Sequence, residues 1–275
     1  MVYNISILCN TLDVRRIAYY REPKKKEKPN YIYNQKILKL IKIIFEKSEK
    51  RFGSPTIHRE LRKKGYIVNI KRVERLMREN NIRAVIGQKK KYKKNNSDCL
   101  KNAVNHLNQK FDVKNLNKVW VSDITEIKTR EGKSYLCVIM DLCSKKIKSW
   151  SISERQTGNL VTRNIIRASK TVKDTEGITF HSDKGCQYTS NEVTKILKVL
   201  RIRQSFSGKG NCYDNAPTES FFATLKKEEI YRKNYNTRKE LEISVFKYID
   251  MYYNKIRPHS NNGGLSPNEY EKLVS

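Results

Sequence analysis

The sequence predicts an α/β protein in which a mixed β-sheet is flanked by helices and preceded by an all-α region. Short runs rich in β-branched and apolar residues, typical of strands, occur between residues 113 and 206. Segments with the 3.6-residue apolar period of helices separate those runs and follow them. The first third shows helical periods alone, interrupted by Gly, Asn and Lys. This order predicts a sheet covered by helices, and 275 residues suffice for about two domains.

The first third is predicted to consist of amphipathic helices. Residues 33–48 place apolar side chains on one face and lysines on the other, as a surface helix does. Residues 5–20 form a further small helical segment. A next helix is expected to be capped by Ser54, to hold Pro55 in its first turn and to end at Gly65.

A second short helix, over residues 70–79, is expected to be capped by Asn69 and to carry a basic outer face. Two short helices joined by a Gly-containing turn fit helix-turn-helix geometry, in which the second helix enters the DNA major groove. The alternative is a structural hairpin with a solvated basic face. The candidate DNA contacts on this helix are Lys71, Arg72, Arg75 and Arg78.

A lysine-rich stretch separates the helical region from the strands. It begins with Lys89, Lys90 and Lys91 and is expected to be a linker that also lies along DNA phosphates. The predicted organisation is therefore a helical DNA-binding region, a basic linker and a catalytic domain. Their bounds are residues 1–88, with the helix-turn-helix at about 52–86, then 89–112 and 113–275.

Three strands are predicted to follow one another as a meander. Residues 118–128 are rich in β-branched side chains and alternate in part. Residues 134–142 are almost continuously apolar, as in a buried central strand, and residues 147–152 alternate again. Short polar turns, the first of which contains Gly132, join the three.

Helices and short strands alternate in the segment that follows. Residues 159–170 have a helical apolar period, and residues 177–182 form a short fourth strand. Residues 190–200 are predicted to be a helix capped by Ser190, and residues 202–206 a fifth strand.

Three carboxylates occupy matching positions in this pattern. Asp123 lies inside the first strand, and Asp183 directly follows the fourth. Glu219 lies on a helix that begins at Pro217, after the Gly- and Asn-rich loop 207–215. We expect the three to meet at one edge of the sheet and to hold two divalent ions, with Asp123 bridging both. Such a pair activates water or a 3′-hydroxyl against a phosphodiester; all-oxygen ligation favours Mg²⁺, with Mn²⁺ as the alternative.

The spacing of these carboxylates does not by itself identify a site. Asp183 and Glu219 are separated by 35 residues, but Asp13 and Glu49 have the same spacing. The second pair lies in a basic, helix-patterned segment with no strand before Asp13. The strand before Asp183 and the loop before Glu219 therefore distinguish the candidate site.

Four blocks around the carboxylates resemble the second-frame transposases of the insertion-sequence-three family, which are DDE transposases similar to retroviral-type integrases. The blocks are Trp120-x-x-Asp123-Ile-Thr, His181-Ser-Asp183-Lys-Gly185-x-Gln187-Tyr188, the stretch from Gly210 through Glu219 to Lys226, and Tyr253-Asn254-x-x-Arg257-Pro258-His259. The resemblance implies an RNase H-like catalytic domain and a two-metal polynucleotidyl transferase that performs DNA cleavage and strand transfer. It also implies that Asp123, Asp183 and Glu219 are the catalytic, metal-binding residues.

Three neighbours of the triad are further candidates. Lys226 follows Glu219 by seven residues, so both project from one helix face. The resemblance favours a DNA contact at Lys226 over a merely solvated lysine. His181 is a candidate for substrate contact or for packing at the sheet end. Arg257 follows the predicted helix 237–253 and is a candidate DNA contact, whereas its polar neighbours are expected to dock that helix.

The composition agrees with a nucleic-acid partner. A net charge of +30 calls for a polyanion such as DNA, although an A+T-rich genome is an alternative cause of the high lysine content. No apolar run approaches the roughly 20 residues of a membrane span, and the start lacks a signal peptide. We therefore expect a bacterial cytoplasmic protein at the nucleoid, with no membrane partner. The six cysteines show no C-x2-C pairing, which excludes the zinc module of retroviral integrases.

The resemblance further implies protein partners. We expect a homo-oligomer on DNA, and the product of an upstream reading frame as a fusion or partner, because the three or four apolar heptads of a coiled coil are absent here. Two alternatives from other classes stay open. One is a catalytically inactive, sequence-specific DNA-binding protein; the other is an RNase H-like nuclease that cuts without joining.

Overall fold

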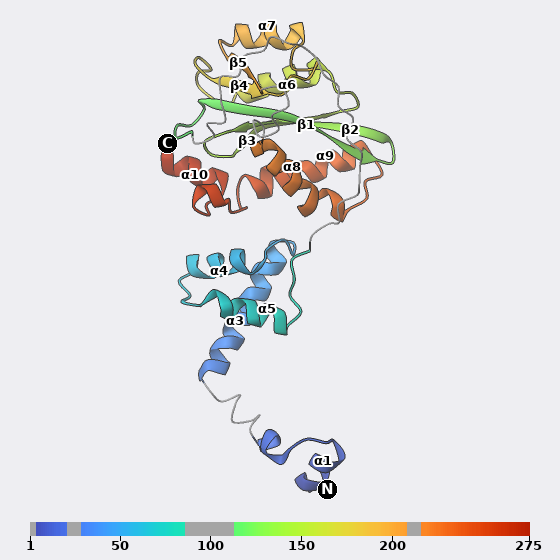
Figure 1. The fold of residues 1–275 in the computed structure, drawn as a ribbon, viewed down its shortest axis with the longest axis vertical. Coiled ribbons are helices and arrows are strands. Elements are labelled where there is room, and N and C mark those ends of the chain that lie inside the picture. Colours follow the sequence, from blue (N-terminus) through green and yellow to red (C-terminus); the bar gives the residue numbers. More distant parts are fainter. Residues whose placement is uncertain (1–3, 21–28, 86–112, 208–215) are drawn as a thin grey trace. The chain divides into compact units, whose positions relative to one another are not determined.

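The computed structural model describes residues 4–20, 29–85, 113–207 and 216–275. They belong to two compact units, Met1–Val85 and Ile86–Ser275, each with a core of its own (Figure 1). The boundary falls close to the predicted end of the helical region at residue 88. The predicted linker 89–112 lies outside the described residues.

The first unit is helical. Its core forms where the apolar faces of three helices meet, and the side chains of Ile37, Ile41, Ile57, Leu61 and Val73 are fully buried there. The apolar periods in the sequence thus mark the faces that pack. The helices are α1 (Ile5–Thr11), α3 (Pro29–Lys47), α4 (Ser54–Lys63) and α5 (Ile70–Glu79).

The two predicted caps of the hairpin α4–α5 have different outcomes. Asn69 caps α5, because its Oδ1 accepts a hydrogen bond of 2.9 Å from the Lys71 backbone N–H. The cap predicted at Ser54 is wrong by one residue: Gly53 is the N-cap of α4 and Ser54 already belongs to the helix. Pro55 is tolerated in either of the first helical positions, so it does not determine where the helix begins.

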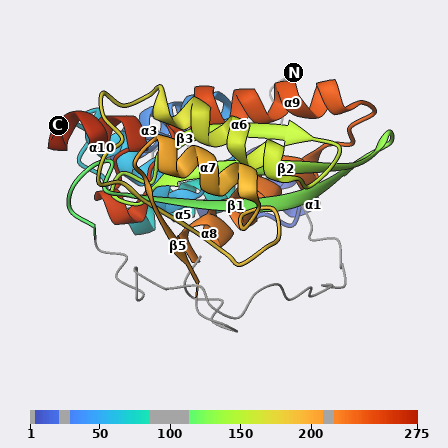
Figure 2. The ribbon, with the colours of Figure 1, turned by 90° about the horizontal axis from the view of Figure 1, so that it is seen from above.

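The second unit is built on the predicted five-stranded mixed sheet, of RNase H-like topology, in the order β3-β2-β1-β4-β5. The pairs β1–β2 and β2–β3 are antiparallel, whereas β1–β4 and β4–β5 are parallel. Figure 2 shows β1 crossing the sheet as its long central strand. The strands are β1 (Val119–Thr129), β2 (Gly132–Asp141), β3 (Ile147–Ser153), β4 (Thr179–Ser182) and β5 (Arg203–Phe206).

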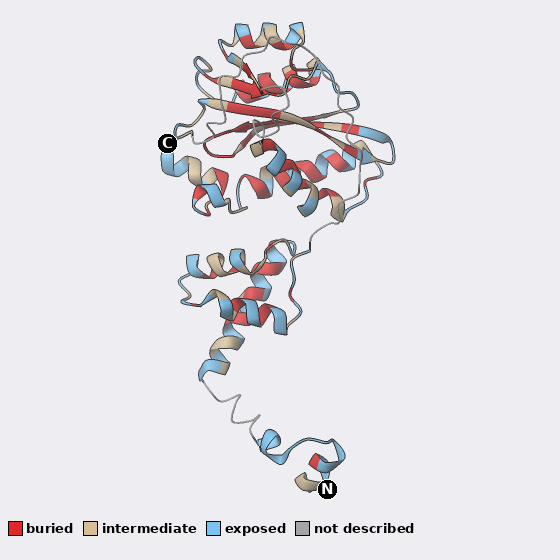
Figure 3. Ribbon diagram, viewed as in Figure 1, coloured by how far each residue is buried: buried red, intermediate tan, exposed pale blue. Residues whose placement is uncertain are grey.

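Helices cover both faces of the sheet, and the buried residues lie in the strands and on the inner helix faces (Figure 3). The helices α6 and α7 lie on one face, over a core centred on Trp120, Phe180 and Tyr188. The helices α8 and α9 lie on the other. The bounds are α6 (Gly158–Ser169), α7 (Asn191–Val199), α8 (Ala216–Glu228), η2 (Ile230–Arg232), α9 (Arg238–Phe246), η3 (Lys247–Tyr253), η4 (Ser260–Asn262) and α10 (Pro267–Val274).

The helix predicted over 237–253 is present, but its second part, η3, is π-helical. The segment after it docks on the edge strand β3. The buried Asn254 side chain accepts a hydrogen bond from the Ile147 N–H and donates one to the Ile147 carbonyl, both at 3.0 Å. An amide side chain thereby replaces the missing neighbour strand at this position. Among the described residues, no helix is both long enough and apolar enough to cross a membrane.

Candidate active site

The sheet brings two of the three carboxylates abreast. In the parallel pair β1–β4, Val121 lies opposite His181. Asp123 and Asp183 each follow by two residues, so they stand side by side where β4 ends. The acids were expected to meet at one edge of the sheet. Asp123 instead lies in the middle of the sheet, because β1 has β2 on one side and β4 on the other.

Backbone hydrogen bonds orient both of these carboxylates. Asp123 is half-buried, and its Oδ1 accepts a bond of 2.7 Å from the Ile124 N–H. Asp183 is also half-buried, and its Oδ1 accepts a bond of 3.0 Å from the Gly185 N–H. Glu219 is exposed in the first turn of α8.

The electrostatics connect Asp123 to both other acids. The pKa of Asp123 is raised to about 7 in total. Burial is the largest cause, the Asp183 and Glu219 carboxylates also raise this pKa, and the Ile124 N–H and Lys226 lower it. The pKa of Asp183 is raised by burial and lowered by its bond from Gly185. The negative charge of Asp183 is the second largest cause of the raised pKa of Asp123, after burial.

The chemistry of the donor set suits a hard divalent cation. All three groups supply carboxylate oxygens, the ligands preferred by Mg²⁺. A cation would also relieve the repulsion that opposes ionisation of Asp123. Within the described ranges, no three His, Cys, Asp or Glu residues are already assembled as a ligand cage. Asp183 and Glu219 nevertheless lie near enough to Asp123 to raise the pKa of its carboxyl.

A buried polar pair beneath the carboxylates was missed by sequence reasoning. The Ser122 hydroxyl donates to the Val138 carbonyl at 2.8 Å and lies 2.9 Å from the Tyr188 hydroxyl. All three residues are buried. This contact joins the strand that carries Asp123 to the segment that follows Asp183. The available signal was a serine inside an apolar strand, together with Tyr188 at the end of the second motif.

The structure gives different surroundings to the three candidate residues near the triad. Lys226 is half-buried and close enough to Asp123 to lower the pKa of that carboxyl. His181 is fully buried with its Nδ1 2.9 Å from the Ser205 hydroxyl, which favours packing over direct contact with substrate. Arg257 makes a bidentate ion pair with Glu228 of α8, which favours docking over DNA contact.

The candidate DNA contacts of the helical unit lie mostly on its surface. Three of them are exposed along α5, whereas Arg72 is half-buried with its guanidinium 5.6 Å from the Tyr33 ring centre. The ring of His58 lies with Nε2 2.9 Å from the Val68 carbonyl, which fixes the turn that sets α5 against α4. The exposed residues are Lys71, Arg75 and Arg78. Lys89, Lys90 and Lys91 lie outside the described residues.

Comparisons with known protein families match most of the chain. Residues 33–91 match the HTH-like domain, and residues 114–212 and 219–274 match two profiles of the integrase core domain. The transposase for insertion sequence element IS904 of Lactococcus lactis subsp. lactis is 38% identical over 257 residues, which are 93% of this chain and 100% of the relative. Transposase InsF for insertion sequence IS3A of Escherichia coli is 34% identical over 271 residues, 98% of this chain and 94% of the relative.

Solved structures with a similar fold include two integrase cores. The HTLV-2 integrase catalytic core domain in complex with magnesium is 17% identical, with a TM-score of 0.43, and the match covers 56% of this chain and 95% of that one. The catalytic core domain of BIV integrase is 20% identical, with a TM-score of 0.43, covering 57% of this chain and 95% of that one.

Proposed function

The chain belongs to the insertion-sequence transposases with an integrase core domain, and we propose that it cuts and rejoins DNA with Asp123, Asp183 and Glu219. The family is one of DNA transposases, so the chain is a polynucleotidyl transferase. The observation that supports the assignment of these residues is the register of β1 and β4, which sets Asp123 beside Asp183, with Glu219 close enough to raise the pKa of Asp123.

The three carboxylates would hold two Mg²⁺ ions, with Mn²⁺ as the alternative. When bound, such a pair activates the attacking water or 3′-hydroxyl and stabilises the leaving oxygen. Asp123 suits the bridging role, because it lies on the central strand β1 and both other carboxylates act on its pKa. The hydrogen bond from the Gly185 N–H holds Asp183 in orientation, and exposed Glu219 approaches from the helix α8.

Lys226 has a positioning role in this proposal. Its ammonium lies near Asp123, on the helix that carries Glu219. A cation at this place binds a DNA phosphate next to the reacting one and offsets part of the negative charge that DNA brings to three carboxylates. Arg257 acts indirectly, since its ion pair with Glu228 holds the C-terminal end of α8.

The helical unit provides a second DNA contact. In the proposed mode, α5 enters a major groove with Lys71, Arg75 and Arg78 toward the DNA. Lys89, Lys90 and Lys91 then bind the phosphates. The two helices of the hairpin pack through apolar residues such as Ile57 and Val73, which leaves this basic face exposed.

The decisive experiment supplies the chain with an element-end duplex, taken from the DNA that flanks its gene, in two forms. One form is intact and the other is pre-cut to expose the 3′-hydroxyl. The proposal expects Mg²⁺-dependent nicking of the first and strand transfer of the second. Nicking without transfer would favour an RNase H-like nuclease, and tight binding without either product would favour a catalytically inactive DNA-binding protein.

We also propose that the active form is a homo-oligomer on bacterial nucleoid DNA. Both ends of an element must be held together during transposition, and an upstream-frame product, as a fusion or partner, would supply the pairing element. On a plasmid that carries both ends, joining that product in frame should strongly raise the yield of paired-end products. Equal yield and equal end selectivity for the chain alone would contradict the need for such a partner.

A further inference from the structure

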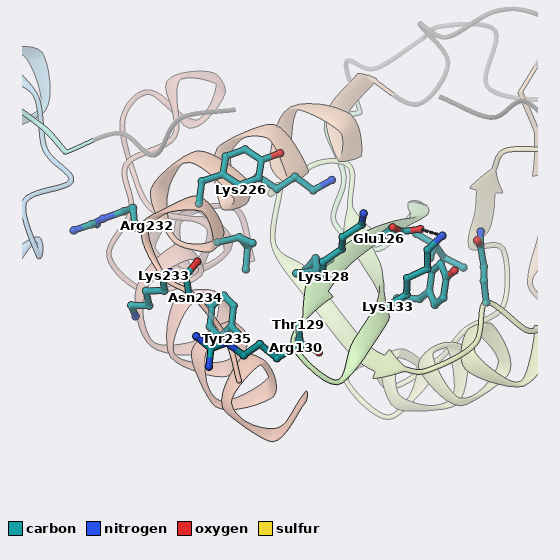
Figure 4. A pocket seen from close by; sticks show the side chains of 16 residues that line it. Glu126, Lys128, Thr129, Arg130, Lys133, Lys226, Arg232, Lys233, Asn234 and Tyr235 are labelled. Carbon is teal, nitrogen blue, oxygen red and sulfur yellow. Dashed lines mark ion pairs between the residues drawn. The ribbon is translucent and has the colours of Figure 1, made fainter. Parts of the chain in front are cut away.

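A basic groove lies between the β1–β2 hairpin and the segment that includes and follows α8 (Figure 4). Its volume is about 1100 Å³. Among the described residues that line it, six are cationic and one, Glu126, is anionic. We call it the hairpin groove. The cationic lining residues are Lys128, Arg130, Lys133, Lys226, Arg232 and Lys233.

Both walls of the hairpin groove are held in place. The strands β1 and β2 pair to their ends, where Thr129 lies opposite Gly132. The Arg130 N–H then donates to the Tyr235 carbonyl at 3.0 Å, which ties the hairpin turn to the segment after η2. The Tyr235 hydroxyl is in turn 3.0 Å from the Ser244 hydroxyl of α9. The groove is therefore part of the folded unit.

Cationic side chains outnumber carboxylates among the described residues that line the groove. Lys133 pairs with Glu126 at 3.0 Å, and Lys233 pairs with the buried Glu229. The remaining lining cations still outnumber the lining carboxylates. A lining of this sign and polarity suits a polyanion.

The hairpin groove is continuous with the candidate active site. Ile124, which directly follows Asp123, lines the groove, and so does Lys226, which lies on α8 together with Glu219. A strand rises about 3.3 Å per residue, so Lys128 on β1 and Arg130 in the turn that follows lie about 17–23 Å from Asp123 along the hairpin. That length equals about five to seven base-pair steps of B-DNA, at 3.4 Å each.

We propose that the hairpin groove binds the sugar-phosphate backbone of the duplex that is cut at the three carboxylates, about five to seven nucleotides from the cut. This inference rests on the proposed function and states along which surface the bound DNA leaves the active site. Continuity with the carboxylates favours DNA over an acidic protein segment, because a duplex seated there must extend past Lys226.

The test uses the full chain and a fluorescent element-end duplex, with binding measured in EDTA so that no cleavage is needed. The variant is Lys128→Gln/Arg130→Gln, in which both positions are exposed. The matched control, Lys195→Gln/Lys198→Gln, removes the same charge from exposed positions of α7 on the opposite face of the sheet. The groove variant should bind about tenfold more weakly at 0.15 M salt and flatten the log–log salt slope by about 0.9 for each lost contact.

Phosphate ethylation interference locates the effect. In the unmodified chain, ethylated phosphates about five to seven nucleotides from the cut should impair binding, and in the groove variant this interference should vanish while that nearer the cut remains. A duplex that ends about three base pairs from the cut on that side should bind both proteins equally well. The proposal would be overturned if the α7 control weakened DNA binding as much as the groove variant, or if the groove variant kept the interference pattern of the unmodified chain. It would also be overturned if polyglutamate displaced the DNA while phosphate ethylation caused no interference.

The outcomes separate this inference from the proposed function. If the groove variant loses the interference while the unmodified chain never nicks the intact duplex, DNA binding by the groove is supported and the transposase chemistry is rejected. Nicking by a chain whose interference pattern does not depend on Lys128 and Arg130 would support the chemistry and reject the groove.

Discussion

The helical unit and the sheet unit use charged residues in opposite ways. On α5, Lys71, Arg75 and Arg78 are exposed and surround a separate apolar core. In the sheet unit, Asp123 and Asp183 are half-buried, and the pKa of Asp123 is raised to about 7 by burial and by the adjacent Asp183. Exposed charge costs little to maintain, whereas clustered, partly buried charge needs a counter-ion. The first unit is thus suited to a polyanion, and the second to a cation and a phosphate together.

The largest effect that this comparison predicts is on catalysis. Glu219→Gln keeps the size of the side chain and removes one charge from the cluster, so nicking and strand transfer should fall by on the order of 10³-fold or more. Because Glu219 is exposed, the midpoint of thermal unfolding should not change. Binding to the element end in EDTA should be kept as well.

The acid pair with the same spacing in the helical unit supplies the control. Glu49→Gln removes an exposed carboxylate that forms an ion pair with Arg51 at 3.0 Å, and it should leave nicking within about twofold. The measurement is single-turnover nicking in Mg²⁺. Near-normal strand transfer by Glu219→Gln would remove this residue from the catalytic set, and an equal loss in both variants would erase the contrast between the units.

Elements with a clear period were predictable from the sequence, and so was their order along the chain. The apolar period of residues 70–79 and the cap at Asn69 gave α5 with its observed bounds. The continuous apolar run after residue 134 indicated a buried strand, which is β2. The sequence placed Asp123 inside one strand and Asp183 directly after another, and from this the approach of the two acids was expected.

Long-range pairing was not predictable, because no local pattern encodes it. The parallel register that sets Asp123 beside Asp183 depends on which strands become neighbours. The ion pair that engages Arg257 depends on Glu228, which lies on a different helix. The hairpin groove joins residues of β1 to residues after α8, so its basic character is invisible in either segment alone. Motif resemblance predicts which acids form the site, but it could not give this environment.

A smaller effect is expected in the helical unit, on binding alone. Lys71→Gln/Arg75→Gln should weaken DNA binding by about tenfold at 0.15 M salt and flatten the log–log salt slope by about 0.9 for each lost phosphate contact. Both residues are exposed, so the fold should not change. The rate of nicking at saturating DNA should also be kept, since the carboxylates belong to the other unit.

The control for that variant is Lys39→Gln/Lys42→Gln, which removes the same charge from exposed positions of α3. Equilibrium titration over a salt series gives both the affinity and the slope. If the two variants behave alike, net charge explains DNA binding and the helix-turn-helix assignment loses its support. If the α5 variant slows nicking at saturating DNA, the functions of the two units are not separable.

The smallest effect concerns a residue that belongs to neither charged surface. Asn254→Ala removes the amide that satisfies both the N–H and the carbonyl of Ile147 on the edge strand β3. Each buried backbone group left without its partner costs about 1–3 kcal/mol, so the sheet unit should lose about 2–6 kcal/mol of its free energy of unfolding. For a unit of this size, the unfolding midpoint should fall by about 4–24 °C. Asn261→Ala, at an exposed position nearby, should change the free energy of unfolding by less than about 0.5 kcal/mol.

Asn254 has no proposed contact with DNA or with the three carboxylates, so the folded variant should still nick DNA at a near-normal rate at low temperature. Scanning calorimetry combined with nicking assays below the unfolding transition tests both expectations. An unchanged midpoint would mean that the edge of β3 does not depend on the docked segment, and a lost nicking rate in fully folded protein would tie that segment to catalysis.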